Sequence, residues 1–157
     1  MDTQTVKFQY VDGADVGLGK PSKATQGSSG FDLRADLLRL SEASLEILVK
    51  PQESYLVPTG IRIAMPEGIE GQIRPRSGLA AKHGVTILNA PGTIDNDYRG
   101  ELQVILMNHG KNEFRIKHGE RIAQIVFVHL PRISLELSQD LTESERGESG
   151  FGSTGLS

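Results

Sequence analysis

Short runs of β-favouring residues, most of them bounded by glycine or proline, recur along the 157-residue chain. They cover residues 6–10, 45–49, 59–65, 69–74, 85–88, 101–107 and 122–129. Glycine and proline between such runs indicate turns, because these two residues interrupt regular structure more strongly than any others. Several short strands at near-regular spacing predict an all-β sandwich or barrel.

Two of these runs differ in their expected burial. In residues 59–65, Ile61, Ile63 and Met65 alternate with smaller or polar residues, which predicts a strand with one buried face. The run at residues 101–107 is more continuously apolar, and we expect it to lie deeper, between two faces.

Only one segment has a convincing helical pattern. Ser77 is a suitable N-cap, residues 79–82 favour a helix, and Gly84 can end the helix in the left-handed conformation. We therefore expect one short helix of a turn or two. Residues 36–44 could add a further helical turn.

The composition, with 37% hydrophobic and 24% charged residues, is that of one ordinary globular domain. Without cysteine, the chain can form neither a disulfide nor a thiolate metal site. A net charge of −3 with no basic run argues against binding long nucleic acid, although a few arginines would suffice for a small polyanion. Since no secretory signal or membrane-spanning apolar run is recognisable, we expect a soluble cytoplasmic protein.

The composition changes near residue 137. Residues 138–157 contain four acidic residues followed by a glycine- and serine-rich stretch. Such a segment cannot bury enough apolar surface to become ordered by itself. We predict a β-rich core over residues 1–137 and a flexible C-terminal arm over residues 138–157.

Residues 74–80 place Arg76, Ser77 and Gly78 where a strand passes into the short helix. Free backbone N–H groups at a helix start, beside an arginine and a hydroxyl, can bind a phosphate. The same residues are also consistent with an N-cap serine next to surface arginines.

Residues 89–100 lie between two predicted strands and contain a proline–glycine pair followed by Asp95 and Asp97. These are strong turn formers, so a β-hairpin with incidental aspartates is one interpretation. The apolar Ile94 beside Asp95, with Tyr98 three residues later, could instead present a base and a flat ring to a small ligand.

Two polar residues stand among apolar ones in other segments. Asp32 could face a cavity, where it would need a cation or hydrogen bonds, or it could form a surface pair with an arginine. Gln124 alternates with Ile122 and Val126, so it could point inward as a donor or serve only a structural purpose.

The last segment of interest, residues 146–155, embeds Arg146 and Phe151 in a glycine- and serine-rich stretch. Backbone amides, hydroxyls, a guanidinium and an aromatic ring match the phosphates and the base of a nucleotide. A flexible terminus is the alternative.

Together and in this order, the five segments resemble the five motifs of the dUTP pyrophosphatase family, and they span residues 29–155. The resemblance implies a jelly-roll-like β subunit with one short helix, a C-terminal arm that closes over the site, and a homotrimer with active sites between subunits. It also implies Mg²⁺-assisted attack of water on the α-phosphorus of dUTP, which yields dUMP and pyrophosphate. Such a reaction keeps uracil out of DNA and supplies dUMP for thymidylate synthesis.

The resemblance also assigns roles to residues. Asp95 would be the general base, and Asp32 would hold Mg²⁺ through water. Tyr98 would pack on the deoxyribose and leave no room for a 2′-hydroxyl, while Phe151 would stack on uracil. The substrate-binding residues implied in this way are Arg76, Ser77, Gly78, Asn89, Thr93, Ile94, Asp95, Tyr98, Gln103, Gln124, Arg146, Phe151, Gly152, Ser153 and Thr154.

Two other functions remain as alternatives. A dCTP deaminase, or its bifunctional relative, shares the fold but would activate water at C4 of the base rather than at phosphorus. A catalytically silent nucleotide-binding trimer is the other. The segment from Asp95 to Tyr98 and the glycine-rich last motif favour the pyrophosphatase, and a silent relative would not need the base.

Overall fold

The structure is a computed structural model, and it describes residues 3–40 and 45–148. Within these ranges the chain forms eleven β-strands, one α-helix and one 3₁₀ helix, which confirms the all-β prediction. The helices are η1 (Val16–Leu18) and α1 (Ser77–His83). The strands are β1 (Lys7–Tyr10), β2 (Phe31–Arg34), β3 (Glu46–Val49), β4 (Ser54–Pro58), β5 (Ile61–Ala64), β6 (Ile69–Arg74), β7 (Val85–Ile87), β8 (Gly92–Ile94), β9 (Gln103–Asn108), β10 (Phe114–Lys117) and β11 (Arg121–His129).

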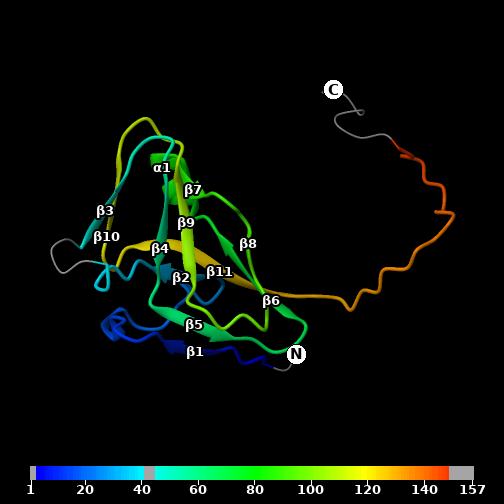
Figure 1. Cartoon of the computed structure of the whole chain (residues 1–157), viewed down its shortest axis with the longest axis horizontal. Coiled ribbons are helices and arrows are strands. Elements are labelled where there is room, and N and C mark those ends of the chain that lie inside the picture. The colour runs from blue at the N-terminus through cyan, green and yellow to red at the C-terminus, as the bar shows by residue number, and fades with distance from the viewer. Residues whose placement is uncertain (1–2, 41–44, 149–157) are drawn as a thin grey trace.

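The strands pair into four small antiparallel sheets that pack around one core (Figure 1). The largest has the order β2-β11-β6-β8, and a second has the order β4-β9-β7. Two ribbons, β1-β5 and β10-β3, complete the body. Most of these neighbours are distant in sequence, so long-range contacts decide where each strand lies.

The buried side chains follow the alternation expected of half-buried strands. Ile61 and Ile63 of β5 and the following Met65 are each less than a tenth exposed, as predicted. In β9, Val104 and Leu106 are buried, but the opposite face is only half-buried. The expectation that this strand is enclosed on both sides is therefore wrong.

Helix α1 begins one residue earlier than the sequence predicts. Arg76 occupies the N-cap position in an extended conformation, without a side-chain cap, and Ser77 is the first helical residue. The prediction of Ser77 as the N-cap is thus wrong. The predicted end is confirmed, because Gly84 adopts the left-handed conformation with φ 67°.

The segment after β2 is not helical where the structure describes it. Residues 37–40 form a turn in which the Leu40 N–H donates to the Leu37 carbonyl at 3.1 Å. The rest of the proposed helical turn, residues 41–44, lies outside the described residues.

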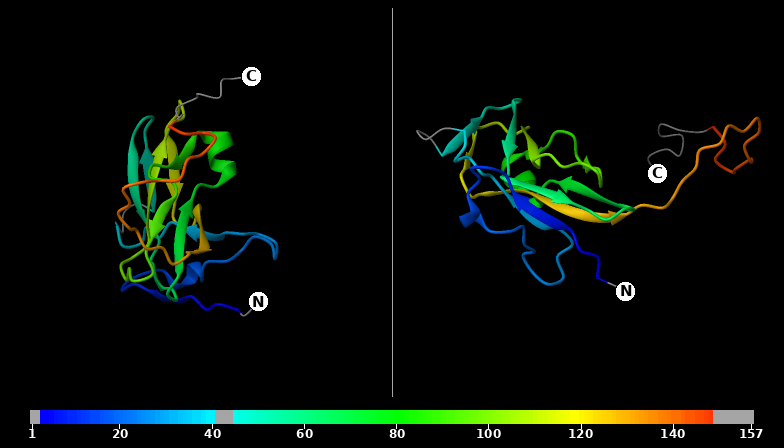
Figure 2. Two further views of the ribbon diagram at one scale, coloured as in Figure 1. Left: turned by 90° about the vertical axis from the view of Figure 1, so that its right-hand side faces the viewer. Right: turned by 60° about the horizontal axis from the view of Figure 1, so that its bottom comes forward.

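The chain leaves the body at the end of β11. Residues 130–148 run away from the sheets without forming a strand or helix, as Figure 1 and the right-hand view of Figure 2 show. Five large apolar side chains in this stretch are exposed, namely Leu130, Ile133, Leu135, Leu137 and Leu141, and Leu135 and Leu137 are exposed almost completely. Within the described ranges, no helix is long and apolar enough to cross a membrane.

Candidate active site

Three antiparallel strands bring the first group of candidate residues onto one rung of a sheet. Gln124 of β11 pairs with Asp32 of β2 on one side and with Arg74 of β6 on the other. The chain then turns from β6 into α1, which places Arg76 next to the same rung. We call Asp32, Arg76, Arg121 and Gln124 the phosphate-side cluster.

Two guanidinium groups hold the Asp32 carboxylate. Its Oδ1 lies 3.4 Å from Nε of Arg76, and its Oδ2 lies 3.1 Å from Nη1 of Arg121. Arg76 also donates from Nη1 to the Arg121 carbonyl at 2.9 Å, which fixes the two arginines relative to each other. Cations held in this way are oriented before an anion binds.

Gln124 is fixed by backbone contacts on two sides. Its Nε2 donates to the carbonyl of Pro75 at 3.0 Å, just before the helix start. Its Oε1 lies so close to Gly30 that a Cβ at Gly30 would come within 2.2 Å of it. The side chain is half-buried, and glycine at position 30 is what leaves room for it.

The Asp95 segment is not the simple hairpin that the sequence suggests. Strands β7 and β9 pair with each other, but the chain between them crosses to the other large sheet, where β8 pairs with β6. Ile94 stands opposite Gly71 in this pairing, and Asp95 follows directly after the strand. The crossing joins the two large sheets at this point.

This crossing forms a small cavity between the sheets. Its volume is about 110 Å³, smaller than a cavity of roughly 150 Å³ that holds a single benzene ring. Four residues singled out in the sequence line it, namely Asn89, Thr93, Ile94 and Gln103, together with apolar residues of β4, β6, β7 and β9. The structure therefore brings together four of the residues to which the resemblance assigns substrate binding.

Asp95 and Tyr98 are presented by a tight turn at the rim of this region. The Tyr98 N–H donates to the Asp95 carbonyl at 3.1 Å, and the Tyr98 hydroxyl donates to the Glu101 carbonyl at 3.1 Å. The ring folds over Gly100, where a Cβ would lie 2.2 Å from the hydroxyl oxygen. Among the described residues, the exposed Asp95 carboxylate has no hydrogen-bond or ion-pair partner.

The cavity and the Asp95 turn, which we call the base-side segment, are distant from the phosphate-side cluster of the same chain. By the register of β8 on β6, Asp95 lies level with a position four residues from Arg74 along β6. At the usual rise per residue this is about 13 Å. Three strand spacings across the sheet add about 14 Å between β8 and β2. Asp95 and Asp32 are thus about 20 Å apart, beyond the reach of a shared reaction centre.

The remaining predicted residues lie at the helix start and on the arm. Ser77 and Gly78 are exposed at the beginning of α1, and a Cβ at Gly78 would meet nothing within 4 Å. Arg146 lies in the last described turn of the arm. Phe151, Gly152, Ser153 and Thr154, which were also predicted to bind substrate, lie outside the described residues.

Arg121 is a functional candidate that sequence reasoning missed. In the sequence, Arg121 only precedes a predicted strand, and nothing indicates a role for it. In the structure, a register shift in the pairing of β11 with β2 places it against Asp32. Two arginines around one carboxylate give this corner an excess of positive charge.

The carboxylates do not form a metal cage. Within the described ranges, no group of three His, Asp or Glu side chains is arranged to hold an ion. Mg²⁺ commonly keeps several waters and needs only one or two carboxylates beside substrate phosphates. A single acid such as Asp32, within a cluster that can bind phosphate, fits that mode of binding.

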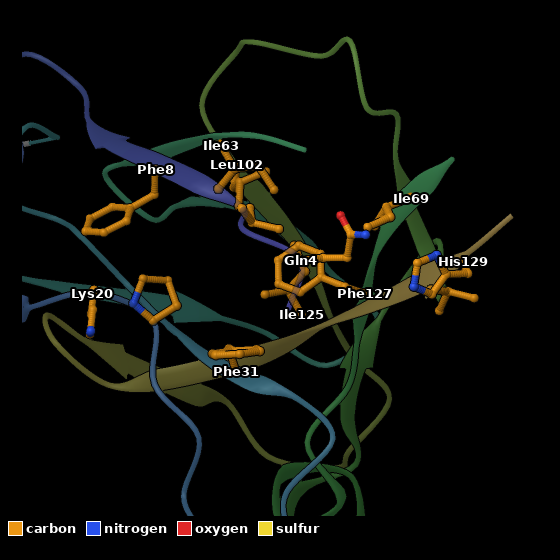
Figure 3. Close-up of a pocket in the computed structure, with 13 residues that line it drawn as sticks. Gln4, Phe8, Lys20, Phe31, Ile63, Ile69, Leu102, Ile125, Phe127 and His129 are labelled. Carbon is orange, nitrogen blue, oxygen red and sulfur yellow. The ribbon is translucent and has the colours of Figure 1, made fainter. Parts of the chain in front are cut away.

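A separate apolar hollow lies away from these residues, between β1 and the end of β11. Phe31 and Phe127 meet edge to face with ring centroids 5.8 Å apart, and Figure 3 shows Phe8 and Ile63 on the opposite wall. Its volume is about 440 Å³. Phe8 is 39% exposed, so part of this apolar surface is accessible to solvent.

Comparison with known proteins shows what the chain is similar to. The family model described as dUTPase matches residues 19–155. The deoxyuridine 5′-triphosphate nucleotidohydrolase of Roseobacter denitrificans is 48% identical over 151 residues, which covers 96% of both chains. That of Neorickettsia sennetsu is 54% identical over 135 residues, covering 86% of this chain and 87% of the relative.

The fold agrees with that of a solved structure. The dUTPase of Staphylococcus bacteriophage 80alpha, in a structure with dUPNHPP, superposes with a TM-score of 0.81 at 27% identity. The match covers 98% of this chain and 100% of the phage chain.

Proposed function

The chain belongs to the dUTPase family and is a dUTP diphosphatase, and from this premise we propose that it converts dUTP to dUMP and pyrophosphate by water attack on the α-phosphorus. The products would follow from cleavage of the bond between the α-phosphorus and the bridging oxygen. The reaction would keep uracil out of DNA and supply dUMP for thymidylate synthesis.

The distance between the two groups of site residues is the observation that carries the proposal. A base about 20 Å from the phosphate-binding residues cannot act on a phosphate that they hold. A second copy that brings its base-side segment to the phosphate-side cluster resolves this separation. We therefore propose a homotrimer with three active sites between subunits.

Two unpaired apolar surfaces support assembly. The hollow around Phe31 and Phe127 is lined by apolar side chains, and the arm exposes Ile133 by about three quarters and Leu135 and Leu137 almost completely. Exposed apolar surface of this kind is typical of a protein interface. Burial between copies would remove both surfaces from water.

On the base side, Asp95 would take a proton from the attacking water. Its carboxylate is exposed and free of partners among the described residues, so its oxygens are available to a water molecule. Asn89, Thr93, Ile94 and Gln103 would surround the uracil, and the Tyr98 ring would pack on the deoxyribose. The fixed Tyr98 ring would leave no space for the 2′-hydroxyl of a ribonucleotide.

On the phosphate side, Arg76 and Gln124 would bind the triphosphate together with the backbone at Ser77 and Gly78. Asp32 would hold Mg²⁺ through water, and the bound ion would neutralise the triphosphate charge that repels a nucleophile. Because Arg76 already forms an ion pair with Asp32, the two side chains are in position before substrate binds. The arm would then close over the site and bring Arg146, Phe151, Gly152, Ser153 and Thr154 to the nucleotide.

A substrate comparison tests this function. Pyrophosphate release from dUTP is measured with and without Mg²⁺, and dCTP and dTTP serve as controls. We expect the protein to hydrolyse dUTP but neither dCTP nor dTTP, and we expect the rate of pyrophosphate release to fall strongly when Mg²⁺ is chelated. Ammonia release from dCTP would identify a deaminase, and tight dUTP binding without pyrophosphate release would identify a silent nucleotide-binding protein.

Subunit mixing tests the shared site. Asp95→Asn subunits and Arg76→Ala subunits should each be inactive alone, because each lacks one half of every site. When the two are co-assembled, random pairing should restore about a quarter of the sites at interfaces with two intact halves. If co-assembly restores nothing, the two halves come from the same chain and the shared site is wrong.

A further inference from the structure

A basic basin lies beside the phosphate-side cluster and extends beyond it, over η1, β2, α1, β10 and the start of β11. Its volume is about 900 Å³. Most of the charged side chains that line it are cationic: Arg34, Arg76, Arg115, Lys117 and Arg121 stand against the single carboxylate of Glu120. This is a positive surface on a chain whose net charge is −3.

Ion pairs within the chain neutralise the basin only in part. Asp32 forms ion pairs with two arginines of the basin, Arg76 and Arg121. Glu46 forms an ion pair with a third, Arg115. Within the described ranges, Lys117 and Arg34 have no carboxylate partner. The basin therefore keeps cations that can bind an acidic segment.

The arm of the same chain carries the complementary charge. Residues 138–148 contain four carboxylates, Asp140, Glu143, Glu145 and Glu148, and one cation, Arg146. Their net charge of −3 equals that of the entire chain, so the rest of the sequence is neutral on balance. Every residue from 138 to 148 is exposed, and none belongs to a strand or a helix.

The arm departs at the end of β11 that is remote from the basin. The strand begins with Arg121 in the basin and ends eight residues later at His129, a distance of about 26 Å. Figure 1 shows the arm continuing away from β10 and α1. The basin is therefore open to the arm of another copy, while the arm of its own copy points elsewhere.

We propose that residues 138–148 dock into the basic basin of a second copy before nucleotide binds, as an electrostatic latch. The latch would hold the glycine-rich end of the arm near the phosphate-side cluster, so that a shorter segment has to be ordered when substrate arrives. Arg76 and Arg121 face both the basin and the cluster, so arm carboxylates and substrate phosphates draw on the same two cations. The inference rests on the proposed assembly and arm closure.

A single spin label on the arm tests the latch in the full-length, nucleotide-free protein. The sequence has no cysteine, so Thr142→Cys provides a unique attachment site. We expect an immobilised component at about 10 mM salt that shrinks towards about 1 M, because the Debye length falls from about 30 to 3 Å. A label that is equally mobile at every salt concentration overturns the latch.

Charge reversal locates the contact. Lys117→Glu should lower the ratio of immobilised to mobile label about two- to fivefold, the effect expected for one exposed ion pair. The matched control is Lys111→Glu, an exposed lysine outside the basin, and it should leave the ratio unchanged. Adding Glu143→Lys to Lys117→Glu should restore part of the loss. Equal effects of the two lysine reversals would contradict docking in the basin.

Mixed assemblies show whose basin is occupied. One kind of subunit carries the spin label and an intact arm, but its basin is changed by Lys117→Glu. The other kind is unlabelled and has an intact basin, but its arm carries Glu143→Lys and Glu145→Lys. The two kinds are co-expressed. Recovery of the immobilised component supports docking on a second copy. Failure to recover it means that the arm binds its own body, which overturns that part of the inference.

The outcome for the latch can be separated from that of the proposed function. A mobile label in a protein that still sediments as a trimer and hydrolyses dUTP overturns the latch alone. A protein that neither assembles nor releases pyrophosphate overturns the proposed function and the latch with it.

Discussion

The phosphate-side cluster and the base-side segment are organised in opposite ways. Around Asp32, every charged group is engaged by the same chain, with two arginines on one carboxylate and Gln124 tied to the backbone. Around Asp95, the backbone is fixed by a strand that crosses between sheets, while the carboxylate itself has no partner among the described residues. In the phosphate-side cluster the side chains themselves are held in place. In the base-side segment only the main chain is held, and the Asp95 side chain is free to form new contacts.

The difference matches what each region has to do. Cations that bind a triphosphate act best when they are oriented in advance, because no reorganisation is then needed as charge develops. A general base must keep its lone pairs available, so an arginine beside it would weaken it. The two requirements conflict at close range, and the proposed division of the site between chains would keep the arginines away from the base until assembly and substrate bring them together.

The largest expected effect comes from removing the free carboxylate. Asp95→Asn should lower kcat about a hundred- to ten-thousandfold, because a positioned base contributes that much to the rate. Since Asp95 has no partner to lose among the described residues, Tm and dUTP binding should stay close to wild type. Pyrophosphate release, thermal melting and calorimetric titration measure the three quantities. Asp97→Asn is the matched control, and turnover near wild type in Asp95→Asn would rule out its role as the base.

Shortening the arm should damage catalysis next most strongly. A chain that ends at residue 145 retains both half-sites but loses Arg146 and everything beyond it. We expect a loss of about a hundredfold or more in kcat/KM, comparable to removal of a transition-state donor. Circular dichroism and Tm should be unchanged, since residues 138–148 bury nothing in the body. Removal of residues 156–157 alone is the control, and full activity of the shorter chain would contradict arm closure.

Gly30→Ala should have an intermediate effect that is specific to the phosphate side. The added Cβ would lie 2.2 Å from Oε1 of Gln124, so that side chain must move. Displacing a positioned polar group by about 1 Å can cost up to about a hundredfold, and we expect about a tenfold loss in kcat/KM. Gly27→Ala is the matched control, because its Cβ would meet nothing within 4 Å. Unchanged kinetics in Gly30→Ala would show that Gln124 has no part in turnover.

The smallest effect is expected at a charge contact outside both regions. His118 accepts the Leu37 N–H at Nδ1, so its Nε2 carries a proton and donates to Asp15 at 2.9 Å. This hydrogen bond, with a second from the Gly17 N–H, lowers the pKa of Asp15 below its ordinary 3.8. A lowered pKa contributes stability above pH 3.8 that is lost as pH falls through the folded-state value.

Asp15→Asn should therefore lower Tm slightly at pH 7, with no change in kcat. The Tm difference from wild type should narrow as the pH falls below 3.8 and Asp15 becomes protonated. Thermal melts across that range measure it. Asp12→Asn, a change at an exposed neighbouring aspartate, serves as the control. A Tm difference that grows towards acid pH would contradict the hydrogen bond to His118.

Local patterns determined most of the strands and one helix end. The alternation of Ile61 and Ile63 predicts the buried face of β5, and the run at residues 69–74 coincides with β6. Gly84 ends α1 because only glycine adopts the left-handed conformation without cost. These features depend on a few neighbouring residues, so the sequence contains them directly.

Pairing partners could not be found in the same way. Strands β2, β4, β8 and β10 were not predicted, and each is held by a partner distant in the sequence. The four-residue strands β2 and β10 contain charged residues and carry little periodic signal. Ser77 was assigned as an N-cap from its residue type, but the turn out of β6 puts Arg76 there. In each case a contact far along the chain outweighed the local preference.

By itself, the sequence determined which residues belong to the candidate site: the five segments that include Asp32, Arg76, Asp95 and Gln124 can be recognised in order along the chain. Only the tertiary structure decided that these residues form two separate groups, that Arg121 joins one of them, and that β8 crosses to β6. The reason is physical, because residue types and spacing report on local conformation. The distance between Asp95 and Asp32 depends on the order and register of strands in a sheet, which the whole core sets together.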